Sequence, residues 1–310
     1  MIVGLIDVDS HNYPNFALMK ISAYHKAQGD TVEWAKKVSL FDRVEYDVIY
    51  CSKIFTFSPD IDTKEYIAKE WKFGGTGYDI KSKLQQDIED CRLMDYTIYP
   101  QYPFSIQFFS RGCIRHCPFC LVHDKEGYIH NATPHDLNPN GKWIEIFDNN
   151  FFANPNWRDA AEYLLKVNKP VNFHGVDVRI MDEEQAEFLN KLKHQGSIHI
   201  AWDLPQIDLR PQLEKMVKYI KPYKISCYIL VGFNSTKEQD LFRARELKKL
   251  GIVPFAQAYR DFNNDRIPTQ YERDFCRWCN SRALFKSADF LQFMPRKGFV
   301  CSYYFDNAEC

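Results

Sequence analysis

The stretch Ser110-Arg-Gly-Cys-Ile-Arg-His-Cys-Pro-Phe-Cys120 places Cys113, Cys117 and Cys120 in the spacing C-x3-C-x2-C, directly after an apolar run. Three cysteines packed this closely are typical of a metal or iron–sulfur site. A four-iron cluster normally takes four thiolates, and no further cysteine follows within the next hundred residues. Three thiolates would leave one iron with an open position, as in catalytic metal centres. The alternative interpretation is a zinc site or three unrelated buried cysteines.

Apolar runs and amphipathic segments alternate around and beyond this stretch. We expect strands at residues 105–109, 143–147, 171–178, 198–202, 225–231 and 254–258. Helices fit between them at residues 157–167, 183–194, 210–220 and 237–250. Such alternation favours an α/β fold with parallel strands, in which ligands gather at the C-terminal strand ends.

Residues 1–100 follow the same alternation and predict a small, doubly wound, Rossmann-like sheet. Expected strands lie at residues 2–8, 31–34 and 46–54, and expected helices at residues 15–28 and 63–71. The Pro- and Tyr-rich residues 96–103 mark a boundary, because prolines disfavour both helix and central strand. We therefore expect an N-terminal domain at residues 1–100, a second domain at 101–295 and a tail at 296–310.

Composition narrows the function classes. The 310 residues carry a formal net charge of −1, so general attraction to nucleic acid or to an anionic membrane is not expected. The chain has no stretch of eighteen apolar residues that would span a membrane. Its first residues lack the basic N-terminal region of a signal peptide, and their apolar sequence predicts a buried strand instead. Ten cysteines in so long a chain, three of them at metal-ligand spacing, favour a reducing cytoplasm.

The cysteine spacing, with aromatic Phe119 before the last cysteine, resembles the radical SAM superfamily at motif level over residues 100–295. The resemblance implies a partial (β/α)6 barrel and a [4Fe–4S] cluster on Cys113, Cys117 and Cys120. It also implies that S-adenosylmethionine (SAM) chelates the open iron and is cleaved reductively to a 5′-deoxyadenosyl radical. A flavodoxin- or ferredoxin-like protein would supply the electron. Arg111 and Arg115 could balance the cluster's negative charge, or be exposed loop cations.

The resemblance places candidate SAM contacts at the ends of the expected strands, namely Asp148, Asn149, Arg179, Asp203, Gly232 and Gln257. Asp148 and Asn149 follow the second strand, where the family presents polar groups to the SAM amino group, although the usual Gly-Gly-Glu is missing. Arg179 resembles an arginine that lies near the SAM carboxylate, and Asp203 stands where the ribose lies. Gly232 is the one glycine kept from the family's Gly-x-Ile-x-Gly segment, which packs on adenine. Polar turns, surface ion pairs or core residues are the competing interpretations.

Further candidates lie on the third and sixth strands. His174, Asp177, Gln257 and Tyr259 are candidate substrate contacts. Asn150 is a further polar residue after the second strand. Cys276 and Cys279 could belong to a second cluster, or could simply be buried on one face of an amphipathic helix.

The segment after the first strand resembles the Asp-x-His-x-x-Gly motif of cobalamin-binding domains. Asp9 and His11 match the motif, with His11 in the place of the cobalt ligand, but Pro14 replaces the glycine. Proline fills the space that a ligand would need near the backbone. We therefore favour an N-terminal domain that serves packing or partner binding, with bound cobalamin as the alternative.

These features together predict a radical SAM enzyme that abstracts hydrogen from a small-molecule, nucleotide or peptide substrate. One alternative is a cobalamin-dependent radical SAM methyltransferase. The alternative from another class is a non-catalytic protein that keeps a metal for stability. Loop geometry sets substrate choice on this fold, so the sequence does not name the substrate.

Overall fold

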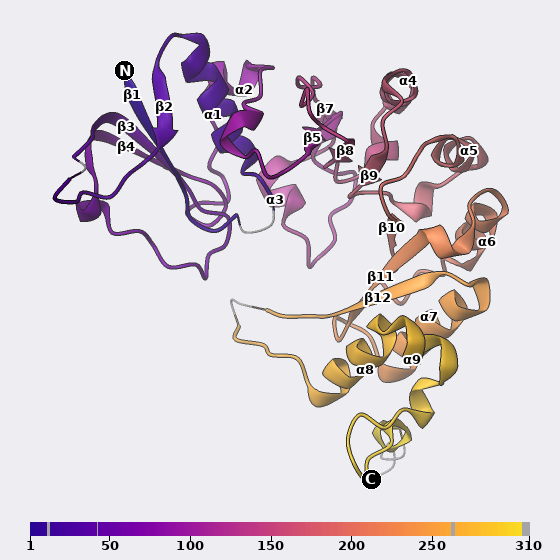
Figure 1. Cartoon of the computed structure of the whole chain (residues 1–310). Coiled ribbons are helices and arrows are strands. Elements are labelled where there is room, and N and C mark those ends of the chain that lie inside the picture. The colour runs from indigo at the N-terminus through magenta and orange to yellow at the C-terminus, as the bar shows by residue number, and fades with distance from the viewer. Residues whose placement is uncertain (11–12, 42, 262–263, 306–310) are drawn as a thin grey trace. The chain divides into compact units, whose positions relative to one another are not determined.

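The computed structural model describes residues 1–10, 13–41, 43–261 and 264–305, and it shows an α/β protein built on parallel sheets (Figure 1). The chain divides into two compact units, Met1–Asp148 and Asn149–Cys310. The α/β class and the parallel pairing predicted from the sequence are confirmed.

The first unit contains a four-stranded parallel sheet with the strand order β2-β1-β3-β4 (Figure 1). Its strands are β1 Ile2–Asp7, β2 Thr31–Trp34, β3 Glu45–Ser52 and β4 Ile67–Gly74. Successive side chains of β1 alternate between the two faces of the sheet. Leu5 packs with Leu18 of helix α1 (Phe16–Ala27), whereas Ile6 packs with Tyr46 and Ile49 in a separate cluster. Both faces of β1 are therefore covered, as its apolar sequence predicts.

Local capping signals set the bounds of α1. The Asn15 side chain accepts a hydrogen bond from the Leu18 amide (3.2 Å), which satisfies one of the unpaired donors of the first turn. The helix ends before Gly29, whose positive φ of 84° terminates it. The helix predicted at residues 15–28 is thus confirmed within one residue at each end.

The helix predicted at residues 63–71 is wrong. A short 3₁₀ turn covers Thr63–Glu65, and the chain then forms β4, which pairs in parallel with β3 from Glu45↔Ile67 to Ser52↔Gly74. Lysine, glutamate and alanine in this segment favour helix, but tertiary contacts can override such intrinsic propensities. Pairing with β3 and packing of Trp71 against the Ile49 cluster outweigh that preference.

A second group of strands in the first unit leads to the cysteines. Strand β5 (Phe104–Gln107) pairs in parallel with β8 (Trp143–Ile146), and the short β6 (Ser110–Arg111) pairs antiparallel with β7 (His130–Asn131). Helices α2 (Gln86–Asp90) and α3 (Val122–Glu126) complete the unit. Met19 of α1 packs with Tyr99, Phe104 and Ile106. This shared core explains why the units divide after Asp148, whereas the sequence suggested a boundary near residue 100.

The second unit continues the alternation of strands and helices. Its strands are β9 Val171–Phe173, β10 Ile198–Ala201, β11 Ile225–Val231 and β12 Val253–Ala258, of which β10, β11 and β12 pair in parallel. Its helices are α4 Trp157–Val167, α5 Glu183–Lys191, α6 Arg210–Tyr219, α7 Lys237–Leu250, α8 Gln270–Asn280 and α9 Arg282–Ser287. The strand predicted at residues 171–178 ends at Phe173, and Asp177 caps a 3₁₀ turn at Val178–Ile180.

Within the part of the chain that the structure describes, none of the helices has both the length and the apolar character needed to cross a membrane.

Candidate functional site

The three cysteines of the motif lie on one short segment, residues 112–121, which we call the cysteine loop. It follows β6 and runs into α3, and its three cysteines form no disulfide bond and are partly buried. The Cys113 amide donates to the Gly127 carbonyl (3.2 Å), and the Cys120 amide donates to the Cys117 carbonyl (2.9 Å). The Arg115 amide donates to the Cys113 Sγ (3.3 Å).

Gly112 and Glu126 fix the conformation at the start of the cysteine loop. Gly112 has a φ of +76°, and a Cβ at this position would stand 2.3 Å from the Tyr128 carbonyl oxygen. The Glu126 carboxylate of α3 accepts from the Gly112 amide (2.8 Å) and from Arg111 Nη2 (2.6 Å). Only glycine fits here, because both the conformation and the space exclude a side chain. The charge of Arg111, a predicted partner of the cluster, is paired with Glu126.

Asp148 holds the strand that leads into the cysteine loop. It is 1% exposed, and its carboxylate accepts from the Phe109 amide (2.9 Å), the Ser110 amide (2.6 Å) and the Ser110 hydroxyl (2.5 Å). Burial raises the pKa of Asp148 to about 6, although these hydrogen bonds act in the opposite direction. Asp148 is thus a positioning residue for the loop. Its contact with SAM stays a prediction.

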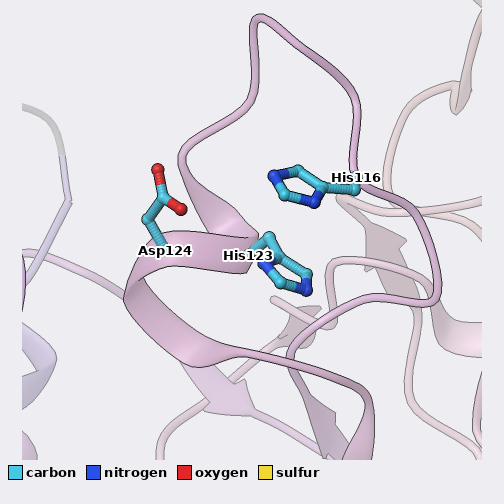
Figure 2. A group of neighbouring side chains, drawn as sticks. All are labelled: His116, His123 and Asp124. Carbon is cyan, nitrogen blue, oxygen red and sulfur yellow. The ribbon is translucent and has the colours of Figure 1, made fainter.

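A second donor set lies in and just after the cysteine loop. Figure 2 shows the rings of His116 and His123 lying beside each other, with Asp124 next to His123 on α3. The rings stack at 4.1 Å with 11° between their planes, and one ligand atom from each of the three residues lies within 4.8 Å of the others. The buried Nε2 of His123 has no hydrogen-bond partner among the described residues. Two imidazoles and a carboxylate are common ligands of zinc and similar metal ions.

The thiols of the cysteine loop are spaced differently from the ligands of a single ion. Among the described residues, the histidine–aspartate set is the one group of three or more His, Cys, Asp or Glu whose ligand atoms all lie within 4.8 Å. Thiolates on one tetrahedral zinc stand about 3.8 Å apart, given a Zn–S distance of about 2.3 Å. The three thiols do not form such a compact group in this structure.

In the second unit, the structure brings several of the predicted residues together after β9 and β10. Asp177 accepts from Asn150 Nδ2 (3.2 Å) and from Arg179 Nε (2.6 Å). The positive charge of Arg179 also acts on the carboxyl group of Asp203. The side-chain oxygen of Asn150, by contrast, is buried without a partner in the part of the chain that the structure describes. Asn149 is half-buried beside this group.

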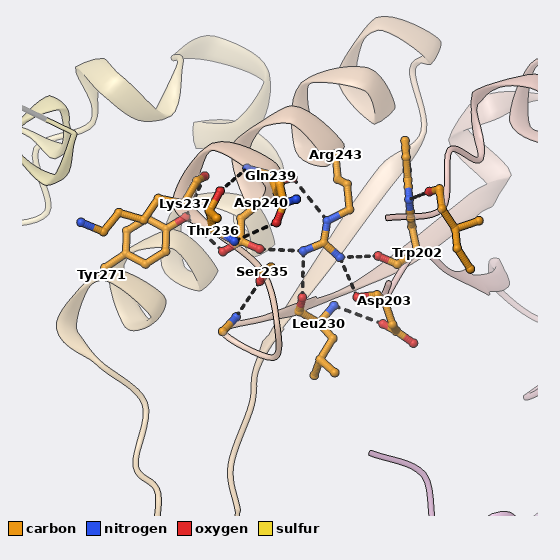
Figure 3. Close-up of polar contacts among 12 residues, drawn as sticks. Trp202, Asp203, Leu230, Ser235, Thr236, Lys237, Gln239, Asp240, Arg243 and Tyr271 are labelled. Atoms are coloured by element: carbon orange, nitrogen blue, oxygen red, sulfur yellow. Dashed lines mark hydrogen bonds and ion pairs between the residues drawn. The ribbon is translucent and has the colours of Figure 1, made fainter. Parts of the chain in front are cut away.

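Arg243 of α7 fixes the backbone around Asp203 (Figure 3). Its buried guanidinium donates to the carbonyls of Trp202 (2.6 Å), Asp203 (3.0 Å) and Leu230 (2.9 Å) and to Asp240 Oδ1 (2.6 Å). Asp203 Oδ1 accepts from the Leu230 amide (3.1 Å). Burial raises the pKa of Asp203, while Arg243 and Arg179 oppose that shift. Sequence reasoning missed Arg243. The clue was an oppositely charged pair, Asp240 and Arg243, three residues apart on the apolar face of α7.

The last two predicted SAM contacts lie near the ends of β11 and β12. Gly232 has a φ of +79°, and a Cβ there would stand 2.1 Å from Glu272 Oε1 and 2.7 Å from Arg266 Nη2. The Glu272–Arg266 ion pair therefore leaves no space for a side chain at position 232. Gln257 is exposed and, with Tyr259, lines a pocket of about 540 Å³. Their contacts with SAM or substrate stay predictions.

The proposed cobalt ligand, His11, lies outside the described residues. Asp9, which precedes it, is buried and accepts from the amides of Ile54 (2.8 Å) and Phe55 (2.9 Å). These bonds tie the loop after β1 to the segment after β3. Asp9 thus has a structural partner of its own, and cobalamin binding stays a prediction.

The segments that follow β3 and β4 are also held by internal contacts. Ser52 accepts from Asn15 Nδ2 (2.9 Å), the Lys53 amide donates to the Gly74 carbonyl (3.0 Å), and the Gly77 amide donates to the Lys53 carbonyl (2.9 Å). A pocket of about 440 Å³ opens at the C-terminal ends of β1 and β2, with Asp7, Asp9, Trp34, Tyr66 and Tyr99 among its lining residues. It is large enough for a small ligand.

The cysteines of α8 form no second metal group among the described residues. Burial raises the pKa of Cys276 to about 12 and that of Cys279 well above its ordinary value. Both thiols are therefore protonated at neutral pH, as expected for packed side chains on a helix.

Comparison with protein-family models gives no match to this chain, and comparison with curated proteins gives none either. The functional argument is therefore carried by the residues and their geometry.

Proposed function

We propose that the protein is a radical SAM enzyme in which Cys113, Cys117 and Cys120 hold a [4Fe–4S] cluster. The observation that carries the proposal is the cysteine loop itself, with three partly buried thiols that form no disulfide bond. The loop follows the parallel strand β5 and the short antiparallel strand β6 of an α/β protein. The three thiols do not form a compact single-ion group in this structure. The finer architecture, a Rossmann-like domain followed by a partial (β/α)6 barrel, belongs to the same proposal.

A [4Fe–4S] cluster held by Cys113, Cys117 and Cys120 would supply the one-electron reduction by which radical SAM enzymes cleave SAM and start hydrogen abstraction from a substrate. The chain's own residues prepare the cluster site. Gly112, Glu126 and Asp148 hold the loop, and the Arg115 amide at the Cys113 Sγ reduces the charge on that sulfur. Hydrogen bonds to the sulfurs are one of the means by which a protein tunes such a centre.

Residues of the second unit are suited to binding SAM. The Arg179 guanidinium is oriented by Asp177 and 25% exposed, which suits bidentate recognition of a carboxylate. Asp203 uses Oδ1 on the Leu230 amide, while its Oδ2 makes no hydrogen bond among the described residues. That oxygen can accept from ribose hydroxyls. We keep a small molecule, nucleotide or peptide as the substrate and a flavodoxin- or ferredoxin-like protein as the electron donor.

One observation favours the alternative of a non-catalytic metal protein. His116, His123 and Asp124 approach one another closely enough to hold a single ion after modest side-chain rotation (Figure 2). A zinc ion bound there, with or without a thiolate from the cysteine loop, would stabilise the loop without any redox chemistry.

Anaerobic reconstitution with iron and sulfide distinguishes the two functions. We expect about four irons per chain, lost in each of Cys113→Ala, Cys117→Ala and Cys120→Ala and kept in Cys91→Ala. Cys91 is a matched control because it is a partly buried free cysteine of the same unit. With dithionite and SAM, the reconstituted protein should release 5′-deoxyadenosine. One tightly held zinc per chain that disappears in the His116→Ala/His123→Ala double variant, together with no bound iron, would establish the alternative.

A further inference from the structure

A pocket of about 540 Å³ lies at the C-terminal ends of the parallel strands β11 and β12, entirely within the second unit. Leu230, Ala256 and Ala258 give it an apolar wall, and Gln257, Arg260 and Arg273 bring polar groups to it. Its volume falls within the range of roughly 300–1,000 Å³ typical of small-molecule sites. The C-terminal ends of parallel strands are also where ligands bind in α/β folds.

The charge of this pocket is one-sided. Arg260 and Arg273 are permanently protonated, and no aspartate or glutamate is among the lining residues that the structure describes. Within the same described residues, neither arginine forms an ion pair, whereas the nearby Arg266 is paired with Glu272 at 2.6 Å. Burial raises the pKa of Cys276, also in the wall, to about 12, so its thiol is neutral and cancels no positive charge.

Arg273 is also held in place before any ligand arrives. Its Nη1 donates to the Pro268 carbonyl (2.6 Å) and its Nη2 donates to Gln270 Oε1 (3.0 Å). A guanidinium fixed by neutral acceptors keeps its full charge and loses little side-chain freedom on binding. Arg260, by contrast, is exposed at the rim, where it can close on a bound anion.

We propose that this pocket binds a small molecule that carries a phosphate or carboxylate group. Arg273 and Arg260 contact the oxyanion, the Gln257 amide donates a further hydrogen bond, and the apolar wall receives the rest of the molecule. Two cations on a chain of net charge −1 suit a compact ligand better than a polyanion such as nucleic acid. The inference rests on the proposed function only in identifying this ligand as the substrate, because the binding itself needs no cluster.

Isothermal titration of the full chain tests the pocket with three probes: inorganic pyrophosphate, adenosine monophosphate and succinate. We expect at least one probe to bind. Comparing the affinities of the two phosphate probes with that of the dicarboxylate shows which oxyanion is preferred. Arg273→Gln and Arg260→Gln should each weaken binding about tenfold, because each removes a charge-assisted contact. Arg277→Gln is the matched control: the same charge is lost from α8, but the Arg277 side chain donates to the Pro295 carbonyl outside the pocket.

Two further measurements keep the result interpretable. Arg273→Lys keeps the positive charge but loses the two parallel N–H donors of the guanidinium. It should therefore bind the probe better than Arg273→Gln does, and the two variants should have the same circular dichroism spectrum. The same titrations in the Cys113→Ala/Cys117→Ala/Cys120→Ala variant should give unchanged affinity, since the pocket lies on other elements. Failure to bind iron would then count against the proposed enzyme alone. The pocket proposal is overturned if no probe binds at millimolar concentration, or if Arg277→Gln weakens binding as much as the pocket variants do.

Discussion

Replacing Gly112 by alanine should open the cysteine loop. A Cβ there would stand 2.3 Å from the Tyr128 carbonyl oxygen and 2.7 Å from the Gly127 carbonyl oxygen. The positive φ alone costs a residue with a side chain roughly 1–2 kcal/mol. Displacing two carbonyls adds about 1–3 kcal/mol, and losing the Gly112–Glu126 hydrogen bond adds about 1 kcal/mol. Gly29→Ala is the control, because Gly29 has a similar φ of +84° and nothing within 4 Å of its Cβ position.

Hydrogen exchange measures this difference directly. These contributions sum to about 3–6 kcal/mol for Gly112→Ala, so the amides of residues 110–131 should exchange from about 100-fold to more than about 10,000-fold faster than in the unmodified chain. Gly29→Ala should leave that segment unchanged. Iron retained after reconstitution should fall in Gly112→Ala as well. Unaltered exchange across residues 110–131 in Gly112→Ala would refute the argument that glycine's close approach holds the loop.

Three other predictions concern single residues. The pKa of Asp148 is raised from 3.8 to about 6, so between these values the folded chain keeps a proton that the unfolded chain has lost. The free energy of unfolding therefore falls as pH rises from below 3.8 to above 6, by about 3 kcal/mol in all and by about 2 kcal/mol between pH 4.5 and 7. Asp148→Asn should remove this fall in urea titrations at pH 4.5 and 7, and an unchanged pH dependence would contradict it. Arg243→Met leaves the Asp240 carboxylate buried without its partner and should cost about 3–5 kcal/mol by urea unfolding, against about 0–1 kcal/mol for the exposed pair lost in Arg245→Met. Because Pro14 replaces the motif glycine, protein mixed with hydroxocobalamin and desalted should retain no stoichiometric corrin absorption; a retained spectrum that shifts in His11→Ala would reverse this prediction.

Elements with strong local signals could be predicted from the sequence. Helix α7 has the predicted bounds because Thr236 and Gln239 form a capping box at its start and Gly251, with a φ of +73°, ends it. Strand β11 likewise matches the apolar run at Ile225–Val231. Such signals lie within a few residues of the element that they define, so a single sequence contains them in full.

Residues 63–71 show where local signals fail. Their composition favours helix, but Ile67–Gly74 forms a strand because β3 offers it hydrogen bonds and Trp71 finds an apolar surface there. The presence of β3 beside residues 67–74 depends on the rest of the fold and not on the sequence of residues 63–71. The sequence could therefore not decide between the two structures.

The sequence by itself determined which donor groups the candidate site offers, because the spacing of Cys113, Cys117 and Cys120 puts three thiols on one loop wherever that loop lies. The tertiary structure alone decided what surrounds them and what else the fold can bind. Asp148 meets Ser110 across 38 residues of chain, and Arg243 meets the Trp202 carbonyl across 41. Contacts between residues so far apart depend on how strands pair and how helices pack, and no local pattern encodes which distant partner will be there.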